Sequence, residues 1–326
     1  MFFMSVVVLA VGFLFLIRGA DFFVEGSAAL ARNFRVPGLV IGLTIVAAGT
    51  SAPELAVSTV AALRGANEIA LSNVVGSNIF NLLSVLGLCA VLYPVSAETG
   101  VLKRDFPISV LATALVFFLS CGDTVCSGKF FQMKMGDNAG NLGRIAGGIL
   151  LVLFVGYIVC LIREAKRHPE PEEEGKRMPL RKCFLRITAG LALIIGGGQA
   201  VVYGAKEIAG ALEMTETLIG LTVVAVGTSL PELVTSIVAA RKGETGLAVG
   251  NVVGSNIFNL LFILGISAVI HPVGVNAASV YDLGILFLAS LLVLFFLRRG
   301  KALQRREGLV MVGLYIADMI FAIVRK

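Results

Sequence analysis

Long apolar stretches alternate with short polar segments along almost the whole chain. A helix that crosses the hydrocarbon core of a bilayer needs about 20 mostly apolar residues, and ten stretches of the sequence meet this requirement. The pattern therefore predicts an all-α polytopic membrane protein with ten transmembrane helices. The predicted spans are residues 2–30, 38–63, 68–93, 105–121, 145–162, 184–211, 216–240, 246–270, 280–297 and 308–324.

The second span contains a polar interruption, GLTIVAAGTSAPELAVS at residues 42–58. A charged side chain such as that of Glu54 is costly inside a bilayer, so it usually faces a cavity and serves an ion or proton pathway. Pro53 donates no backbone hydrogen bond, and its ring clashes with the preceding turn, which releases the carbonyls near Gly49 and Thr50. Carboxylate, hydroxyl and carbonyl oxygens together predict a site for a hard cation.

This interruption occurs twice. GLTVVAVGTSLPELVTS at residues 220–236 lies 178 positions after the first copy and places Glu232 where the first copy has Glu54. The same shift carries NVVGSNIFNLL at residues 73–83 onto the identical segment at residues 251–261. We therefore expect two copies of a two-helix unit, with broken helices at spans 2, 3, 7 and 8.

Each of these spans places polar residues three and four positions apart, which aligns them on one helical face. The short connection between spans 2 and 3 favours a cavity lined by both faces. For span 3 alone an alternative stays open, because small and Ser or Asn residues also join membrane helices without binding anything. The first copy contributes Ala47, Thr50, Ser51, Glu54, Ser58, Asn73, Ser77, Asn81 and Ser84; the second contributes Ala225, Thr228, Ser229, Glu232, Ser236, Asn251, Ser255 and Asn259.

Composition agrees with a membrane protein. Of the 326 residues, 57% are hydrophobic and 15% charged, and the mean hydropathy of +0.92 excludes an ordinary soluble globular protein. The first span starts at the N-terminus without a basic region or a convincing cleavage site, so we expect a retained helix and not a signal peptide.

The net charge of +6 is explained by the membrane and not by nucleic acid. Cytoplasmic loops carry an excess of Lys and Arg. The loops that follow odd-numbered spans hold 19 of these residues and the opposite side holds 7. This bias places residues 163–183 in the cytoplasm and both termini outside. Arg18 remains inside the first span, where Asp21 lies one turn away and is expected to pair with it.

The two copies imply an inverted repeat. Five spans separate each segment from its copy, and because five is odd, the second half crosses the membrane in the opposite sense. Inverted repeats with broken helices and a midplane ion site are a recurring architecture of secondary transporters. We therefore divide the chain into a first five-helix repeat (1–162), a solvated linker (163–183) and a second, inverted repeat (184–326).

The site chemistry favours calcium. Glu54 and Glu232 supply two negative charges, and no His or Cys lies nearby, which disfavours softer metals. Calcium accepts six to eight oxygens in tolerant geometry, whereas magnesium dehydrates reluctantly. Two sodium ions would balance the same charges, so one carboxylate pair can support an exchange of sodium for calcium. No cofactor is expected, and the oligomeric state is left open.

The five cysteines show no metal-binding pattern. Cys121 and Cys126 fall in the loop after span 4, which the charge count places outside. An external disulfide between them is one alternative, since such bonds form in oxidising compartments. Two unpaired thiols are the other.

The doubled GTSAPEL/GTSLPEL and GNVVGSNIFN segments resemble the alpha repeats of sodium/calcium exchangers, in the calcium/cation antiporter superfamily. The resemblance covers all ten spans and implies a multi-pass prokaryotic plasma-membrane antiporter without the calcium-sensing domains of animal exchangers. It also implies that Glu54 and Glu232 are the central calcium ligands. The full ligand set that it implies is Ala47, Thr50, Ser51, Glu54, Ser77, Asn81, Ala225, Thr228, Ser229, Glu232, Ser255 and Asn259.

In the family that this chain resembles, several members carry Asp at the position of Asn259. In potassium-dependent relatives this position is typically Asp, whereas Asn keeps an oxygen ligand without the charge, so we expect transport that is independent of potassium. The alternative is that Asn259 only hydrogen-bonds a neighbouring helix. A proton-coupled calcium antiporter of the same fold is the alternative function. An intramembrane protease would need a catalytic pair in the apolar spans, which is not found, so we expect no enzyme. A channel is disfavoured by the repeats and broken helices.

Overall fold

A computed structural model describes residues 2–65, 67–96, 98–167, 178–211, 225–300 and 302–325. Within these residues the chain is almost entirely helical. Eight helices are long and apolar enough to cross a membrane, and a ninth candidate, Gly38–Thr50 with Ala52–Leu63, is bent by 50° at its break. The predicted span at 216–240 is described only from residue 225, and the linker residues 168–177 lie outside the described part, so the predicted number of ten spans stays a prediction.

The chain divides into two compact units, each built from both halves of the sequence. Unit 1 comprises Met1–Pro53 and Ile162–Val252, and unit 2 comprises Glu54–Leu161 and Val253–Lys326. The unit boundaries fall inside three helices, α4 (Ala52–Leu63), α8 (Arg144–Arg167) and α13 (Thr245–Ile257). The division of the sequence into residues 1–162, 163–183 and 184–326 remains a prediction.

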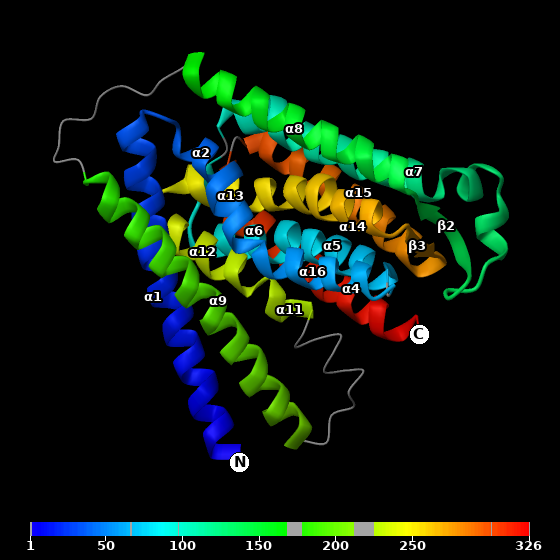
Figure 1. The fold of residues 1–326 in the computed structure, drawn as a ribbon, viewed down its shortest axis with the longest axis horizontal. Helices are drawn as coiled ribbons and strands as arrows, with labels where there is room; N and C mark the ends of the chain where they lie inside the picture. Colours follow the sequence, from blue (N-terminus) through cyan, green and yellow to red (C-terminus); the bar gives the residue numbers. More distant parts are fainter. Residues whose placement is uncertain are drawn as a thin grey trace. The chain divides into compact units, whose positions relative to one another are not determined.

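Unit 1 is built around two long helices, α1 (Phe2–Phe34) and α9 (Leu180–Ala211). They pack along most of their length and lie side by side in Figure 1, α1 in blue and α9 in green. Glycines allow this approach: a Cβ atom on Gly190 would lie 2.7 Å from the carbonyl oxygen of Gly19. The remaining elements of the unit are α2 (Gly38–Ile41), η1 (Gly42–Val46), α3 (Ala47–Thr50), α11 (Ala225–Thr228), α12 (Leu230–Arg241) and the first part of α13.

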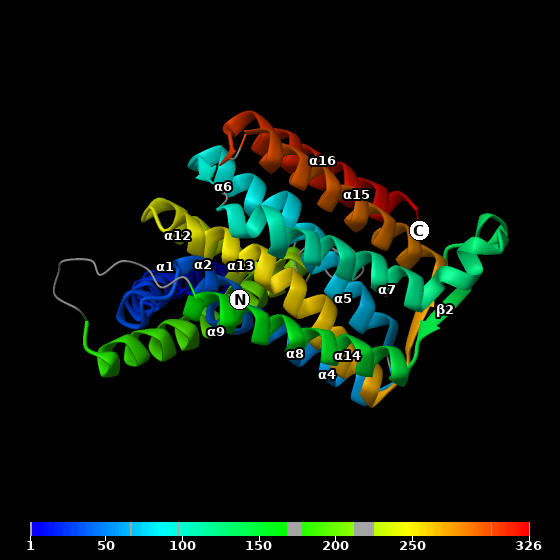
Figure 2. The same ribbon diagram turned by 90° about the horizontal axis from the view of Figure 1, so that it is seen from above.

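Unit 2 holds the remaining long helices. In Figure 2, α7 (Phe106–Cys126) runs alongside α15 (Ala277–Gly300), and the two are in contact. Two small antiparallel pairs, β1 (Val95–Ser96) with β4 (Ala302–Leu303) and β2 (Asn138–Leu142) with β3 (Val273–Asn276), join loops that are distant in the sequence. The other elements are α5 (Asn67–Ile79), η2 (Phe80–Val85), α6 (Leu86–Leu92), β1 (Val95–Ser96), η3 (Val101–Asp105), η4 (Lys129–Gln132), β2 (Asn138–Leu142), α8 (Arg144–Arg167), η6 (Phe258–Ile263), α14 (Leu264–Ile270), β3 (Val273–Asn276), β4 (Ala302–Leu303) and α16 (Arg305–Val324).

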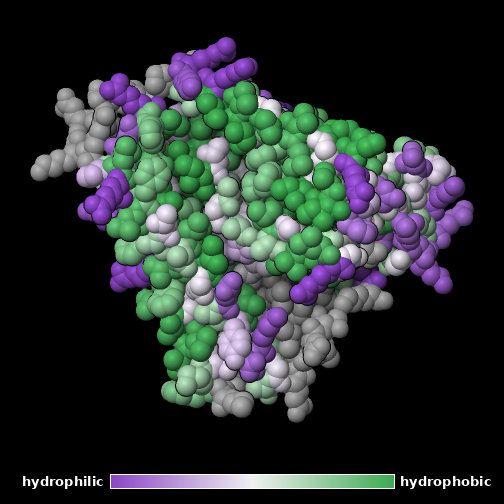
Figure 3. Space-filling view, in the orientation of Figure 1, coloured by the Kyte–Doolittle hydropathy of each residue, from purple (hydrophilic) through white to green (hydrophobic). Residues whose placement is uncertain are grey.

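The outer helices of unit 2 expose apolar side chains. Leu111, Phe118 and Val152 are 66%, 64% and 71% exposed. In Figure 3 green hydrophobic residues cover these helices, and purple hydrophilic residues gather at the end that carries β2. A surface of this kind is stable against lipid and not against water. The finding supports the assignment of these helices as membrane spans.

The sequence repeat is also a structural repeat. Each element of the second copy begins and ends at the positions equivalent to those of its counterpart: α3 corresponds to α11, α4 to α12, α5 to α13, η2 to η6 and α6 to α14. The breaks at Ser51 and Ser229 confirm the predicted interruption of spans 2 and 7. They occur where Pro53 and Pro231 remove a backbone donor.

Spans 3 and 8 differ from the prediction of broken helices. Each continues through its polar segment, but η2 and η6 widen locally into a π-helix. In η2 the N–H group of Leu86 donates to the carbonyl of Asn81, five residues earlier, and Leu264 donates to Asn259 in η6. Neither segment contains a proline, so the ladder is shifted and not interrupted. Such π-bulges are frequent at functional sites.

The cysteines do not form the disulfide that the sequence left open. Cys121 and Cys126 both lie within α7, which extends further than the predicted span, and both are free thiols. Cys121 is buried and Cys126 is exposed. The alternative of two unpaired thiols is therefore the one observed.

Candidate functional site

Both glutamates occupy the first turn of a helix that starts directly after a break. Glu54 is the third residue of α4, and Glu232 is the third residue of α12. Unpaired backbone N–H groups and the helix dipole give this position a partial positive charge, which stabilises a carboxylate. Both side chains are 0% exposed. Such burial is costly for a carboxylate unless donors or a cation compensate its charge.

In unit 1, oxygen atoms gather around Glu232. Ser51 Oγ donates to Glu232 Oε1 at 2.8 Å, so the break before α4 supplies a hydroxyl to the carboxylate of α12. Asn251 Nδ2 donates to the backbone carbonyl of Glu232 at 3.3 Å and to Ser236 Oγ at 2.9 Å. The hydroxyl of Thr50 lies 2.9 Å from Asn251 Oδ1. All five residues are buried.

In unit 2, a second group of oxygens surrounds Glu54. Ser77 Oγ donates to Glu54 Oε1 at 3.3 Å. Asn73 Nδ2 donates to the backbone carbonyl of Glu54 at 3.4 Å and to Ser58 Oγ at 3.0 Å. Asn73 therefore braces α4 against α5 as Asn251 braces α12 against α13. The two bracing asparagines occupy equivalent positions in the two copies of the repeat.

The π-helical segments carry the amide candidates. Asn81 is the second residue of η2, and Asn259 is the second residue of η6. Both are 0% exposed, as is Ser255. Within the described residues, Asn81 Oδ1, Asn259 Oδ1 and Ser255 Oγ are buried and accept or donate no hydrogen bond. Buried polar atoms normally have a partner. These three oxygens are therefore available to a cation.

Most of the predicted ligands share this buried setting. The structure brings Ser51 to Glu232 and Ser77 to Glu54. Thr228 is half-buried, and the side chain of Ala225 lies outside the described part. The buried members of the predicted set are Ala47, Thr50, Ser51, Glu54, Ser77, Asn81, Ser229, Glu232, Ser255 and Asn259.

These oxygens suit a hard cation. The segments 42–58, 73–84, 220–236 and 251–261 contain no Lys, Arg, His or Cys. Across the described residues, no three His, Cys, Asp or Glu side chains cluster as a conventional metal site. Single carboxylates supplemented by hydroxyl, amide and carbonyl oxygens match the preferences of calcium and sodium better than those of transition metals.

Comparison with known proteins now identifies the family. The family described as sodium/calcium exchanger protein matches residues 4–163 and 182–324, which is most of the chain. The chain belongs to the sodium/calcium exchanger family. It is therefore a multi-pass membrane protein of a family of cation antiporters.

Individual exchangers and antiporters match over nearly their full length. The putative antiporter CaxA of Alkalimonas amylolytica is 37% identical over 318 residues, which cover 94% of each chain. The sodium/calcium exchanger MaX1 of Methanosarcina acetivorans is 32% identical over 338 residues, covering 96% of this chain and 97% of the relative. A solved structure of the sodium-calcium exchanger NCX_Mj superposes with a TM-score of 0.81 at 30% identity, covering 98% and 99% of the two chains.

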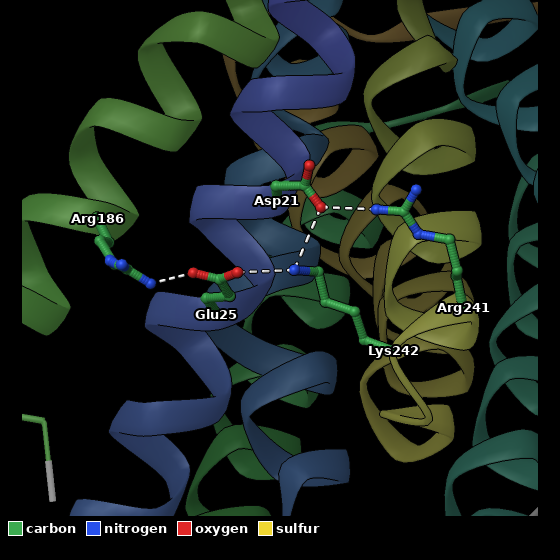
Figure 4. Close-up of polar contacts among 5 residues, drawn as sticks. All are labelled: Asp21, Glu25, Arg186, Arg241 and Lys242. Atoms are coloured by element: carbon green, nitrogen blue, oxygen red, sulfur yellow. Dashed lines mark hydrogen bonds and ion pairs between the residues drawn. The ribbon is translucent and has the colours of Figure 1, made fainter.

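Asp21 of span 1 does not form the ion pair that the sequence predicted for it. Figure 4 shows that Asp21 faces Arg241 and Lys242, and the nitrogen-to-oxygen distances are 2.8 and 3.2 Å. The ion pairs of Asp21 among the described residues do not include Arg18. Glu25 pairs with Lys242 at 2.8 Å and with Arg186. Arg241 and Lys242 belong to the opposite half of the sequence, so helix spacing could not reveal them. This cluster ties α1 to α9 and to the turn after α12, within unit 1.

Sequence reasoning also missed part of the amide chemistry. Asn78 and Asn256 were not among the predicted ligands, yet both are buried and hydrogen-bonded in unit 2. One signal was present in the sequence: the identical GSNIFN segments contain two asparagines each, and only the second of each pair was assigned.

Proposed function

We propose that this exchanger family member moves calcium across the membrane in exchange for sodium, by alternating access, with Glu54 and Glu232 each contributing one negative charge to the transported cation. The observation that carries the proposal is the pair of fully buried glutamates, each in the first turn after a helix break and each contacted by a serine hydroxyl. Two carboxylates neutralise one calcium ion or two sodium ions, so the cations compete.

The remaining ligands in this proposal are neutral oxygens. They are Ala47, Thr50, Ser51, Ser77, Asn81, Ala225, Thr228, Ser229, Ser255 and Asn259. Neutral ligands leave the charge balance to the two glutamates. A third sodium ion would therefore make the loaded site positive and the transport step sensitive to voltage.

Alternating access is supported by the repeat. Elements α3 to α6 and α11 to α14 agree in their bounds, residue for residue. We propose that they belong to two inverted five-helix repeats in a ten-helix protein. Two copies with opposite orientation can exchange conformations, which would expose the ions alternately to the two sides.

The decisive experiment measures calcium uptake into vesicles that contain the purified protein. One set carries an outward sodium gradient, one a pH gradient and one no gradient. Uptake driven by sodium and unaffected by a proton ionophore supports the proposal. Uptake driven only by the pH gradient would replace it with a proton-coupled calcium antiporter, and the absence of calcium uptake under every gradient would reject calcium as the substrate.

A further inference from the structure

Four buried asparagines in unit 2 form a closed pattern of hydrogen bonds. Asn78 Nδ2 donates to the backbone carbonyl of Asn256 at 3.2 Å, and Asn256 Nδ2 donates to the backbone carbonyl of Asn78 at 3.3 Å. We call this reciprocal pair the amide clasp. Its two members occupy equivalent positions in the repeat, so each copy supplies one.

The amide clasp fixes the direction of both of its side chains. A backbone carbonyl only accepts hydrogen bonds, so the atom of Asn78 and of Asn256 that faces it must be the nitrogen. The oxygen of each amide then points the other way. Asn78 Oδ1 accepts from Asn259 Nδ2 at 2.9 Å, and Asn256 Oδ1 accepts from Asn81 Nδ2 at 3.2 Å.

The same logic extends to the next two amides. Because Asn81 and Asn259 must direct their nitrogens at the amide clasp, their oxygens face away from it. Those oxygens are buried, and among the described residues neither has a hydrogen-bond partner. If either amide were reversed, it would present an NH₂ group, which repels a cation, where it now presents an oxygen. A cation is the ligand that this orientation suits.

We propose that Asn78 and Asn256 are positioning residues that set the calcium affinity of the exchanger by holding the amides of Asn259 and Asn81 with their oxygens toward the ion. This inference rests on the proposed function. The assignment crosses the repeats: Asn78 of the first copy orients Asn259 of the second, and Asn256 of the second orients Asn81 of the first. Neither positioning residue touches the ion in this proposal.

The crossed assignment gives a specific test. Asn78→Ala is made alone, in an Asn259→Ala background and in an Asn81→Ala background. The KM for calcium is measured in sodium-loaded vesicles, together with the calcium-induced rise in melting temperature of the purified protein. Without Asn78, the amide of Asn259 is free to rotate, so we expect the KM of the single variant to rise about tenfold, equivalent to about 1.4 kcal/mol.

The two backgrounds separate orientation from general support. With Asn259→Ala present, there is no amide for Asn78 to orient, and adding Asn78→Ala should raise the KM no further. With Asn81→Ala present, the full tenfold increase should remain. A matched control, Ser290→Ala, removes a buried hydrogen bond to the Leu286 carbonyl of α15 in the same unit and should leave the KM unchanged.

Several results would overturn the proposal. In the first, the KM of Asn78→Ala is unchanged while the amount of folded protein or the maximal rate falls. This result would show that the amide clasp is a purely structural contact. An equal rise of KM in both backgrounds would do the same. If Asn259→Ala itself leaves the KM and the calcium-induced stabilisation unchanged, the ligand assignment of the proposed function fails instead, so the two failures are distinguishable.

The repeat supplies a second, independent version of the test. If Asn78→Ala does not fold, Asn256→Ala is combined with Asn81→Ala and with Asn259→Ala, and the expected pattern is the mirror image. Asn78→Leu is a third variant of similar size, in which both the donor to the Asn256 carbonyl and the acceptor for Asn259 Nδ2 are lost. A tenfold rise in KM for Asn78→Leu that vanishes with Asn259→Ala supports the proposal, and an unchanged KM contradicts it.

Discussion

At the scale of single residues, the charges of Glu54 and Glu232 control the proposed transport. Each carboxylate is fully buried in the first turn of its helix. We expect Glu54→Gln or Glu232→Gln to reduce sodium-driven calcium uptake more than about a hundredfold, because either change removes half of the charge that balances the divalent ion, and a loss of about 2.8 kcal/mol of binding free energy is already a hundredfold. Both variants should still insert in the membrane. The exposed Glu207→Gln is the control, and substantial uptake by either site variant would remove that residue from the site.

Potassium dependence is a second property that one residue decides. Asn259 keeps an oxygen ligand but lacks the charge that an Asp would add. Two formal negative charges balance one calcium ion but not calcium together with potassium. We expect sodium-driven calcium flux to be equal with and without potassium on either side of the vesicle membrane. A strict potassium requirement in the wild-type protein would show that Asn259 has been misinterpreted.

The candidate ligand residues stand out in the sequence because their signal is local and doubled, and their binding of ions stays a prediction. A carboxylate beside a proline in an apolar span is rare, and the second copy confirms the register. The reciprocal hydrogen bonds of Asn78 and Asn256 could not be predicted, because they join the two halves of the sequence. The partners of Asp21 were hidden for the same reason, since Arg241 and Lys242 both lie in the other half.

At the scale of elements, the contact between α1 and α9 depends on glycine. A Cβ atom at Gly190 would lie 2.6 Å from the backbone nitrogen of Phe23 and 2.7 Å from the Gly19 carbonyl, and backbone atoms cannot move aside locally. We expect Gly190→Ala to destabilise the protein by about 1–3 kcal/mol, the usual effect of overpacking. This should appear as a lower melting temperature in detergent.

Gly196 provides a matched control on the same helix. A Cβ atom there meets nothing within 4 Å. Ala is the better helix former by about 1 kcal/mol, so Gly196→Ala should keep or raise the melting temperature. Equal melting temperatures for the two variants would contradict the close packing of α1 on α9.

The ion-pair cluster at Lys242 predicts a dependence on alkaline pH. Burial acts to lower the pKa of Lys242, but hydrogen bonds from its ammonium to Glu25 and Asp21, with their charges, outweigh burial and raise this pKa above its ordinary value. A raised pKa stabilises the fold fully below the unfolded-state value of about 10.4, and this stabilisation is lost as the pH rises through the folded-state value.

The comparison is between the wild-type protein and Lys242→Met. We expect the melting temperature of the wild type to exceed that of the variant at pH 8, and the difference to shrink as the pH rises above about 10.4, where the ammonium loses its proton. Lys206→Met, an exposed lysine of α9, serves as the control. A difference that is independent of pH would show that Lys242 stabilises the protein by packing and not by charge.

The helix breaks and the π-helices show what sequence can predict about elements. Pro53 and Pro231 indicated the interruptions of spans 2 and 7, because a missing backbone donor interrupts the helix close to the proline. The π-helices of spans 3 and 8 have no such residue, so polar spacing alone wrongly suggested a break. The close approach of Gly19 to Gly190 was not predicted, because a pairing across two helices leaves no local signal in the sequence.

At the scale of the whole molecule, the sequence halves and the compact units are different divisions. The apolar pattern located nine described spans, counting the bent pair, because membrane helices differ sharply from their loops in hydropathy. It could not show which spans pack together, since all of them are similarly apolar. Each unit combines segments of both sequence halves, and such grouping depends on small complementary surfaces that composition does not record.

The membrane orientation provides the last test. Lys and Arg residues number 19 in loops that follow odd-numbered spans and 7 on the other side. Such a bias normally marks the cytoplasmic side. An even number of ten spans puts both termini on one side, and the linker after five spans on the other. We therefore expect a tag between His168 and Gly175 to be reachable only from the cytoplasm, and a tag after Lys326 only from outside, when a membrane-impermeant reagent is applied to intact cells and to inverted vesicles. If both tags react from the same side, the number of crossings between them is even, and the inverted repeat cannot be correct.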